Sequence, residues 1–171
     1  LSLLEKFLYN KNFSRVLELG CGSGRASGTV VSTIPTADYT FSDLSKRMLE
    51  EARQHLPKNS SFIVSDAVEY MENTKDMYDL VYTLWSFSHS THQHIHRLGI
   101  EKAGDYISFV IKKFIRENIV KDGSLFLIHF DSLSQEQSIL MRQWKRVFTA
   151  FANIKKQSPS KQIIDKTLLE L

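Results

Sequence analysis

The stretch VLELGCGSG occupies residues 16–24, and the rest of the sequence is best interpreted outward from it. Its first four residues are typical of a short buried strand, and glycines follow at Gly20, Gly22 and Gly24. Glycine adopts backbone conformations that other residues avoid, and it lets a ligand approach the main chain closely. The stretch therefore predicts a strand that ends in a ligand-binding turn.

The composition fits one globular domain. The 171 residues are 42% hydrophobic and 24% charged, with a formal net charge of +3, which is enough apolar content for a single core. Lysines and arginines are scattered and are densest in the last quarter, which we interpret as solvated surface, with a nucleic-acid partner as the alternative.

The single cysteine, Cys21, excludes an internal disulfide and a thiolate metal cluster, so we expect a reducing compartment and a cytoplasmic location. No run approaches the ~20 apolar residues of a membrane span, and we expect no membrane association. The chain begins at Leu1 rather than at a methionine, which is also compatible with trimming at one or both ends.

Apolar stretches alternate with helical patterns about five times along the chain. Strands are predicted at 16–19, 39–42, 62–64, 79–84 and 125–128. Ser45 is a plausible cap for a helix over 46–56, and Asp122-Gly123 predicts a turn before the last strand. The histidine-rich stretch 85–99 is irregular and shows neither a strand pattern nor a helical pattern. This order predicts an α/β fold in which helices cover both faces of a parallel sheet and ligands bind beyond the carboxyl ends of its strands.

The spacing of the glycines argues against a phosphate ligand. A dinucleotide fingerprint has glycines at its first, third and sixth positions, and a phosphate loop ends in Gly-Lys-Ser/Thr; neither pattern is present. We expect instead a compact, partly zwitterionic ligand against the backbone.

Two acids follow predicted strands. Asp43 is placed to accept both hydroxyls of a ribose, and Asp66 to accept from an adenine amino group. Each also has a structural alternative, because Asp43 could complement a helix dipole and Asp66 could cap the short helix that follows it.

In this order and spacing, the motifs resemble the class I S-adenosylmethionine-dependent methyltransferases. Residues 16–24 are similar to the family's first motif, 41–45 to its second-strand segment, and 65–67, 78–81 and 120–125 to its later landmarks. The resemblance spans about residues 13–130. It implies a Rossmann-like three-layer sandwich with a mainly parallel sheet and one methyltransferase domain over 1–171. The family's C-terminal antiparallel strands are expected to be short or missing, since 152–171 is short and lysine-rich.

The resemblance also implies a cofactor, S-adenosylmethionine, and a product, S-adenosylhomocysteine. Glu18 would organise the turn or water around the methionyl amine, and Leu44 would cover one face of the adenine. Cys21 is interpreted as a small packing residue of the turn rather than a nucleophile. The cofactor-binding set carried over is Glu18, Gly20, Cys21, Gly22, Gly24, Asp43, Leu44, Asp66 and Ala67.

The methyl acceptor is expected beside the segment after the fourth strand. His89 is the candidate general base, because imidazole has a suitable pKa and the residue follows the fourth landmark closely. Trp85 and Phe87 could offer aromatic faces to the acceptor or pack in the core. His129, with Asp131, is a second candidate acceptor pair. We expect no metal, although histidines recur in the segment.

The sequence thus predicts methyl transfer to oxygen or nitrogen of a small molecule. An RNA or protein acceptor, or a cofactor-binding domain without turnover, stays open as an alternative. The sequence does not indicate an oligomeric state.

Overall fold

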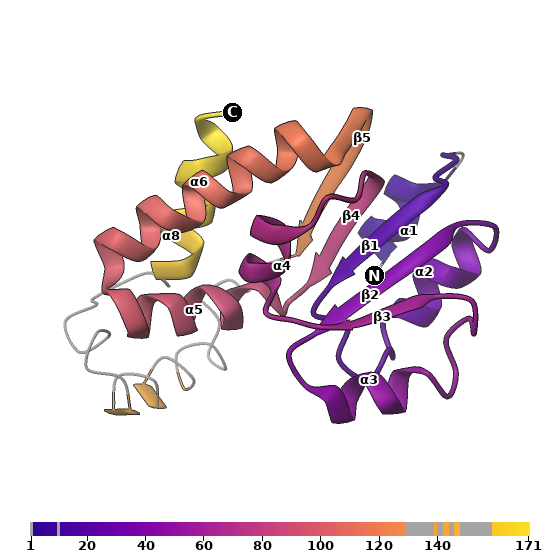
Figure 1. Cartoon of the computed structure of the whole chain (residues 1–171), viewed down its shortest axis with the longest axis horizontal. Helices are drawn as coiled ribbons and strands as arrows, with labels where there is room; N and C mark the ends of the chain where they lie inside the picture. The colour runs from indigo at the N-terminus through magenta and orange to yellow at the C-terminus, as the bar shows by residue number, and fades with distance from the viewer. Residues whose placement is uncertain (1, 10, 129–138, 140–141, 144–145, 148–158) are drawn as a thin grey trace.

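The fold is a three-layer sandwich around a parallel sheet (Figure 1). The computed structural model describes residues 2–9, 11–128, 139, 142–143, 146–147 and 159–171. The strands of this part run in the order β3-β2-β1-β4-β5, and each neighbouring pair is parallel. They are β1 (Arg15–Leu19), β2 (Asp38–Asp43), β3 (Ser61–Val64), β4 (Tyr78–Leu84) and β5 (Ile119–Ile128). The predicted α/β class and three-layer arrangement are confirmed.

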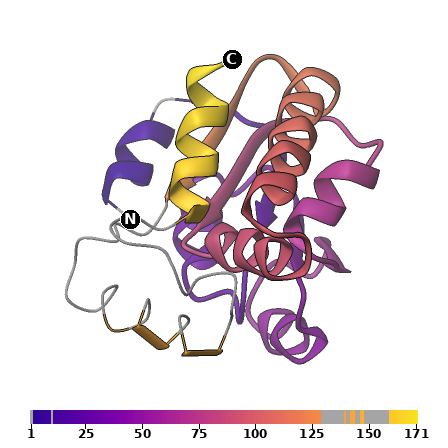
Figure 2. The same ribbon diagram turned by 90° about the vertical axis from the view of Figure 1, so that its left-hand side faces the viewer.

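Helices cover both faces of the sheet because neighbouring residues of a strand point to opposite sides. In β1, Val16 packs into a core beneath the first three helices, whereas Leu17 and Leu19 pack into a core beneath the others. The first group is α1 (Ser2–Leu8), α2 (Ser27–Thr33) and α3 (Lys46–Ala52). The second is α4 (Ala67–Asn73), α5 (Phe87–Leu98), α6 (Ile100–Asn118) and α8 (Pro159–Leu169), with α8 alongside α6 (Figure 2).

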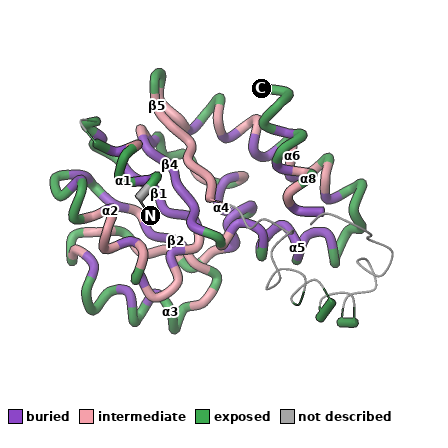
Figure 3. The backbone as a smooth tube through the Cα atoms, turned by 180° about the vertical axis from the view of Figure 1, so that it is seen from behind, coloured by how far each residue is buried: buried purple, intermediate pink, exposed green. Residues whose placement is uncertain are grey.

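The two strands at the centre of the sheet carry the deepest burial. β1 and β4 are buried along most of their length, while β5 is only half-buried (Figure 3). Strands that are covered on both faces have continuous apolar sequences, and β1 and β4 were therefore recognisable from the sequence. The predicted cap of α3 is also confirmed, since the Ser45 side chain accepts a hydrogen bond from the Met48 backbone N–H at 3.4 Å.

The histidine-rich stretch is helical, which the sequence did not indicate. Residues 87–98 form α5, and its buried residues include Ser90, Thr91, His92 and His94 beside few apolar ones. A buried helix is recognised from apolar residues that recur every three to four positions. Most of the buried side chains of α5 are polar, so the sequence does not show this pattern.

The predicted turn at Asp122-Gly123 lies inside a strand. α6 ends at Asn118 and β5 begins at Ile119, with no connecting loop between them. The ladder with β4 advances two residues from Tyr78 to Leu80 but five from Ile119 to Ser124, so the extra residues form a bulge. Asp122 lies in the bulge at φ 65°, a conformation typical of turns. The sequence therefore indicated the local backbone conformation correctly, but the prediction that the turn precedes the strand was wrong.

The described end of the chain is a helix rather than a strand. α8 packs against α6 and α5, and the sheet contains no antiparallel strand among the described residues. None of the described helices is long and apolar enough to cross a membrane.

Asp79 ties the start of β1 to β4. Its carboxylate accepts hydrogen bonds from the backbone N–H groups of Ser14 at 2.7 Å and Arg15 at 2.9 Å. Replacing it with alanine removes two charge-assisted hydrogen bonds, so Asp79→Ala should lower the free energy of unfolding by about 2 kcal/mol.

Urea denaturation measures this effect, and Asp76→Ala is the matched control. Among the described residues, the Asp76 carboxylate forms only an exposed ion pair with Arg15 at 3.4 Å, which is worth less than about 1 kcal/mol. Equal losses in the two variants would contradict the role assigned to Asp79.

Candidate functional site

The turn after β1 is held against the end of β2 by three consecutive backbone amides. The N–H groups of Gly20 and Cys21 both donate to the Ser42 carbonyl, at 2.8 and 2.9 Å, and the Gly22 N–H donates to Asp43 Oδ2 at 2.8 Å. This path requires positive φ angles of 75° at Gly20 and 56° at Gly22. Glycine is therefore needed at both positions for conformational reasons.

The glycines of the turn differ in what surrounds them. A Cβ on Gly20 would lie 2.4 Å from the Cβ and Oγ of Ser86, whose hydroxyl donates to the Leu19 carbonyl at 2.7 Å. A Cβ on Gly24 would lie 2.8 Å from Leu56 Cδ1, so this glycine allows close packing with the segment after α3. Gly22 has open space around its missing side chain.

A cavity of about 210 Å³ opens at the carboxyl ends of the strands. It adjoins a second cavity of about 400 Å³, with which it shares Leu44, Asp66 and Gln93. Together they fall within the range of roughly 300–1,000 Å³ that ligand sites occupy. The residues that line the first cavity are Gly20, Asp43, Leu44, Ser65, Asp66, Ala67, Ser86, His89, Ser90 and Gln93.

The cavity brings together six of the residues that the sequence singled out: Gly20, Asp43, Leu44, Asp66, Ala67 and His89. Ser86, Ser90 and Gln93 belong to the same wall but were missed. Ser86 precedes α5, and Ser90 and Gln93 lie in its first and second turns, so no signal for them existed until the stretch was known to be helical.

Asp43 is fixed by the backbone while keeping acceptor capacity. Oδ2 takes the Gly22 N–H and Oδ1 takes the Ser45 N–H, each at 2.8 Å. A carboxylate oxygen can accept two hydrogen bonds, so each oxygen can still receive one hydroxyl. Its structural and ligand-binding interpretations are therefore compatible.

Asp66 caps α4 and sits between that helix and α5. Oδ1 accepts from the backbone N–H groups of Val68 at 2.9 Å and Glu69 at 3.2 Å, and from Ser90 Oγ at 2.8 Å. Burial alone would raise the pKa of Asp66, but hydrogen bonds from His94, Ser90 and Glu69 outweigh it and hold the pKa below its usual range. Asp66 is thus a carboxylate at neutral pH. Ala67, the first residue of α4, adds a backbone N–H that has no acceptor within its own helix.

Glu18 lies beneath the turn rather than in the cavity wall. It is fully buried and accepts a hydrogen bond from the Tyr82 hydroxyl at 2.7 Å. Burial raises its pKa from 4.5 to about 7, against the opposing effect of the hydrogen bonds it accepts. The side chain is therefore poised to change charge near neutral pH.

Three other predicted residues, Cys21, Phe87 and Trp85, do not line the cavity. Cys21 is buried in the core, and burial raises the pKa of its thiol far above the usual value, as expected for a packing residue. Phe87 is part of the core beneath α6. Trp85 is 37% exposed at the end of β4, with an unusual φ of 62°. His129 and Asp131 lie outside the described residues.

The histidines of α5 differ in how far they are buried. His89 is exposed in the first turn and lines the cavity, whereas His92 and His94 are buried. Within the described part of the chain, no group of three histidine, cysteine or acidic side chains could hold a metal ion.

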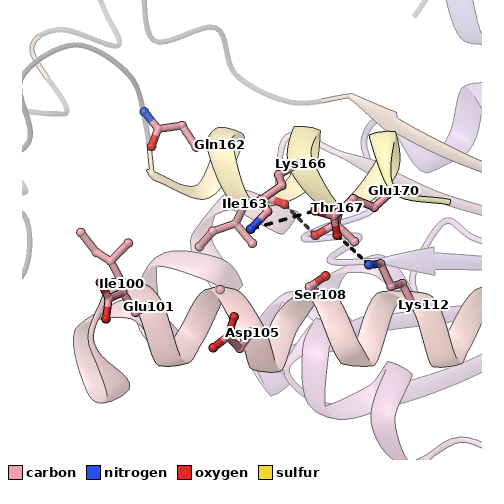
Figure 4. A pocket seen from close by; sticks show the side chains of 11 residues that line it. Ile100, Glu101, Asp105, Ser108, Lys112, Gln162, Ile163, Lys166, Thr167 and Glu170 are labelled. Carbon is pink, nitrogen blue, oxygen red and sulfur yellow. Dashed lines mark hydrogen bonds and ion pairs between the residues drawn. The ribbon is translucent and has the colours of Figure 1, made fainter.

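A larger cavity of about 660 Å³ lies apart from the strand ends, between α6 and α8 (Figure 4). Two lysines that line it form ion pairs with Glu170. Lys112 Nζ lies 2.7 Å and Lys166 Nζ 4.0 Å from the Glu170 carboxylate. None of the predicted site residues lines it. The strand-end cavity is therefore the candidate site.

Comparison with known proteins agrees with this choice. A sequence profile described as a methyltransferase domain matches residues 16–102, a range that contains every residue lining the strand-end cavity. Malonyl-[acyl-carrier protein] O-methyltransferase 1 of Ilyobacter polytropus is 35% identical over 87 residues, which cover 49% of this chain and 32% of that protein. The matched segment thus spans about a third of that relative.

Solved structures share the fold at low sequence identity. The cyclopropane synthase MmaA2 of Mycobacterium tuberculosis aligns with a TM-score of 0.63 at 14% identity, over 99% of this chain and 57% of that chain. CalS10, a SAM-bound amino pentose methyltransferase from Micromonospora echinaspora, aligns with a TM-score of 0.54 at 19% identity, over 75% of this chain and 49% of that chain.

The buried carboxyl of Glu18 should make stability depend on pH. Between pH 4.5 and about 7 the folded chain keeps the Glu18 proton while the unfolded chain releases it. The stabilisation is therefore complete below about pH 4.5 and is lost as the pH rises to about 7. Glu18→Gln keeps an acceptor for Tyr82 but cannot titrate, so the wild type should lose roughly 3 kcal/mol relative to this variant across that range.

Urea unfolding of both proteins from pH 4.5 to pH 8 measures the difference, and all other titratable groups cancel in the comparison. Parallel stability curves would show that Glu18 titrates in the folded chain as it does in the unfolded one.

Proposed function

The chain belongs to the methyltransferase-domain family, and on that premise we propose that it transfers a methyl group from S-adenosylmethionine to oxygen or nitrogen of a small molecule. The observation that carries the proposal is the convergence of the glycine turn, Asp43 and Asp66 on one cavity at the carboxyl ends of β1, β2 and β3. In a parallel sheet these ends are where ligands bind.

The residues present fit an adenosyl ligand. Asp43 would accept the ribose hydroxyls with the acceptor capacity left on each oxygen. Asp66, with the Ala67 N–H beside it, would receive the adenine, and the exposed side chain of Leu44 would cover one face of the base. Gly20 lines the same cavity and would meet the methionyl part through its backbone, while Ser86 fills the space of its missing side chain.

The cofactor would supply an activated methyl group on a sulfonium, so the chain itself needs to align the acceptor. An amine acceptor must also lose a proton, whereas a carboxylate attacks without losing one. Orientation of reacting groups can contribute about 7–11 kcal/mol. His89 lines the same cavity as Gly20, and we propose it as the general base. Trp85, exposed at the end of β4, would contact the acceptor.

A small carboxylic acid or amine is the acceptor we favour. The Ilyobacter polytropus relative is named for O-methylation of a malonyl group on acyl-carrier protein, which supports an oxygen acceptor. The second candidate is an RNA acceptor, because ribosomal RNA small subunit methyltransferase C of Haemophilus influenzae is 30% identical over 79 residues. The proposal further includes one domain over residues 1–171 and, from the single free cysteine, a cytoplasmic location.

Binding of S-adenosylhomocysteine tests the cofactor assignment. By calorimetry the wild type should bind it, and Gly20→Ala should weaken binding by about tenfold or more, because the new methyl group meets Ser86 at the cavity wall. Gly22→Ala is the matched control, since it places a side chain at a similar positive φ but in open space. No binding by the wild type, or equal losses in the two variants, would contradict the proposed site.

Methyl transfer identifies the acceptor class. The chain is incubated with methyl-tritiated S-adenosylmethionine and, separately, with short carboxylic acids free or linked to acyl-carrier protein, with amines, and with RNA. Label should appear in an ester or amine, and with an amine acceptor His89→Gln should reduce the rate by roughly 100-fold without changing affinity for S-adenosylhomocysteine. Label confined to RNA would favour the second candidate, and cofactor binding without transfer to any acceptor would indicate a non-catalytic domain.

A further inference from the structure

The carboxylate of Asp66 is unusually constrained for a residue at a ligand site. Beyond the two backbone amides that it caps, Oδ1 accepts from Ser90 Oγ at 2.8 Å and from His94 Nε2 at 3.1 Å. All four donors converge on this one oxygen. No hydrogen bond among the described residues uses Oδ2, although Asp66 lines both strand-end cavities.

The protonation of His94 follows from its other neighbour. Arg97 Nη2 lies 3.0 Å from His94 Nδ1, and a guanidinium group can only donate, so Nδ1 accepts. The ring proton then resides on Nε2 and is donated to Asp66. The side chains of His94 and Asp66 are only 3% and 8% exposed, so this hydrogen bond is shielded from water.

Arg97 lies at the outer end of this chain of contacts. Its Nη1 is 3.7 Å from Glu69 Oε1, and both side chains are at least half exposed. An exposed ion pair of this kind contributes little energy. Its consequence is geometric, because a guanidinium beside Nδ1 leaves that nitrogen without a proton, while the Asp66 carboxylate fixes the ring proton on Nε2.

We propose that His94 is a positioning residue that holds Asp66 with Oδ2 presented to the cavity as an acceptor, so that the site distinguishes a 6-aminopurine from a 6-oxopurine. This inference rests on the proposed function. An adenine amino group would donate to the free oxygen, whereas a 6-oxo group would bring a second acceptor against a fixed carboxylate. A site built around a hydrogen bond rejects analogues that cannot make it far more strongly than an apolar pocket does.

Without His94, Asp66 keeps its capping bonds to the α4 amides but gains freedom to rotate. Either oxygen could then turn toward Ser90 and the α4 amides, and a water molecule could bridge the carboxylate to a 6-oxo group. Selectivity should therefore fall more than overall affinity.

The test compares two ligands, S-adenosylhomocysteine and its 6-oxo analogue S-inosylhomocysteine, by calorimetry. The wild type should prefer the amino ligand by about 100-fold or more. His94→Leu should reduce this ratio by about tenfold, whereas His94→Gln should retain it, because a glutamine amide can donate to Asp66 and accept from Arg97. Ser90→Ala, which removes another donor to Oδ1, should shift the ratio in the same direction as His94→Leu.

A purely structural role would weaken both ligands equally, and an unchanged ratio in His94→Leu would overturn the inference. If the wild type binds neither ligand, the proposed function fails and the inference fails with it. If the wild type binds the amino ligand and the ratio is insensitive to residue 94, only the inference fails.

The tautomer is measured independently on the free chain. Nitrogen-15 NMR of the histidine rings should show His94 neutral, with its proton on Nε2, and Arg97→Leu, which removes the donor to Nδ1, should no longer hold that nitrogen unprotonated. An imidazolium, or a proton on Nδ1, would overturn the positioning role whether or not the variants fold well.

Discussion

The site depends on how the end of β2 holds the turn that follows β1. Two residues, Ser42 and Asp43, receive three successive amides of the turn, and the accepting groups are a carbonyl and a carboxylate at adjacent positions. A turn held this way cannot drift from the strand ends, so Gly20 stays beside the acids of β2 and of the segment after β3. The pre-organisation of the cavity is thus a property of the sheet rather than of a flexible loop.

Asp43 and Asp66 use their carboxylates in a similar way, and this resolves an ambiguity present in the sequence. A helix-capping role and a ligand-binding role looked like competing interpretations of each acid. In the structure both acids bond to backbone amides and still have acceptor capacity. The hydrogen bonds from the backbone fix the orientation of each carboxylate. The lone pairs that these bonds leave unused can then accept hydrogen bonds from a ligand in a defined direction.

Much of this arrangement could be predicted from the sequence because the central strands are apolar runs that end in recognisable residues. The positions of β1 to β4, the cap at Ser45 and the shared location of Gly20, Asp43 and Asp66 follow from local patterns. α5 could not be found in this way, because its buried side is built from hydroxyls and imidazoles that carry no hydrophobic period. The partners of Asp66 on that helix are separated from it by 24 and 28 residues, and only the packing of α5 against α4 identifies them.

The direct junction between α6 and β5 has a consequence for how such a chain changes over evolution. Most neighbouring elements are joined by loops that absorb a gained or lost residue, but here the last helical residue is followed at once by a strand residue. Between the end of α6 and the regularly paired residues 124–128 of β5, only the bulge around Asp122 and Gly123 can accommodate a change in chain length. Insertions and deletions are thus tolerable at 120–123, whereas one residue gained between Ser124 and Ile128 would turn every following side chain to the opposite face of the sheet.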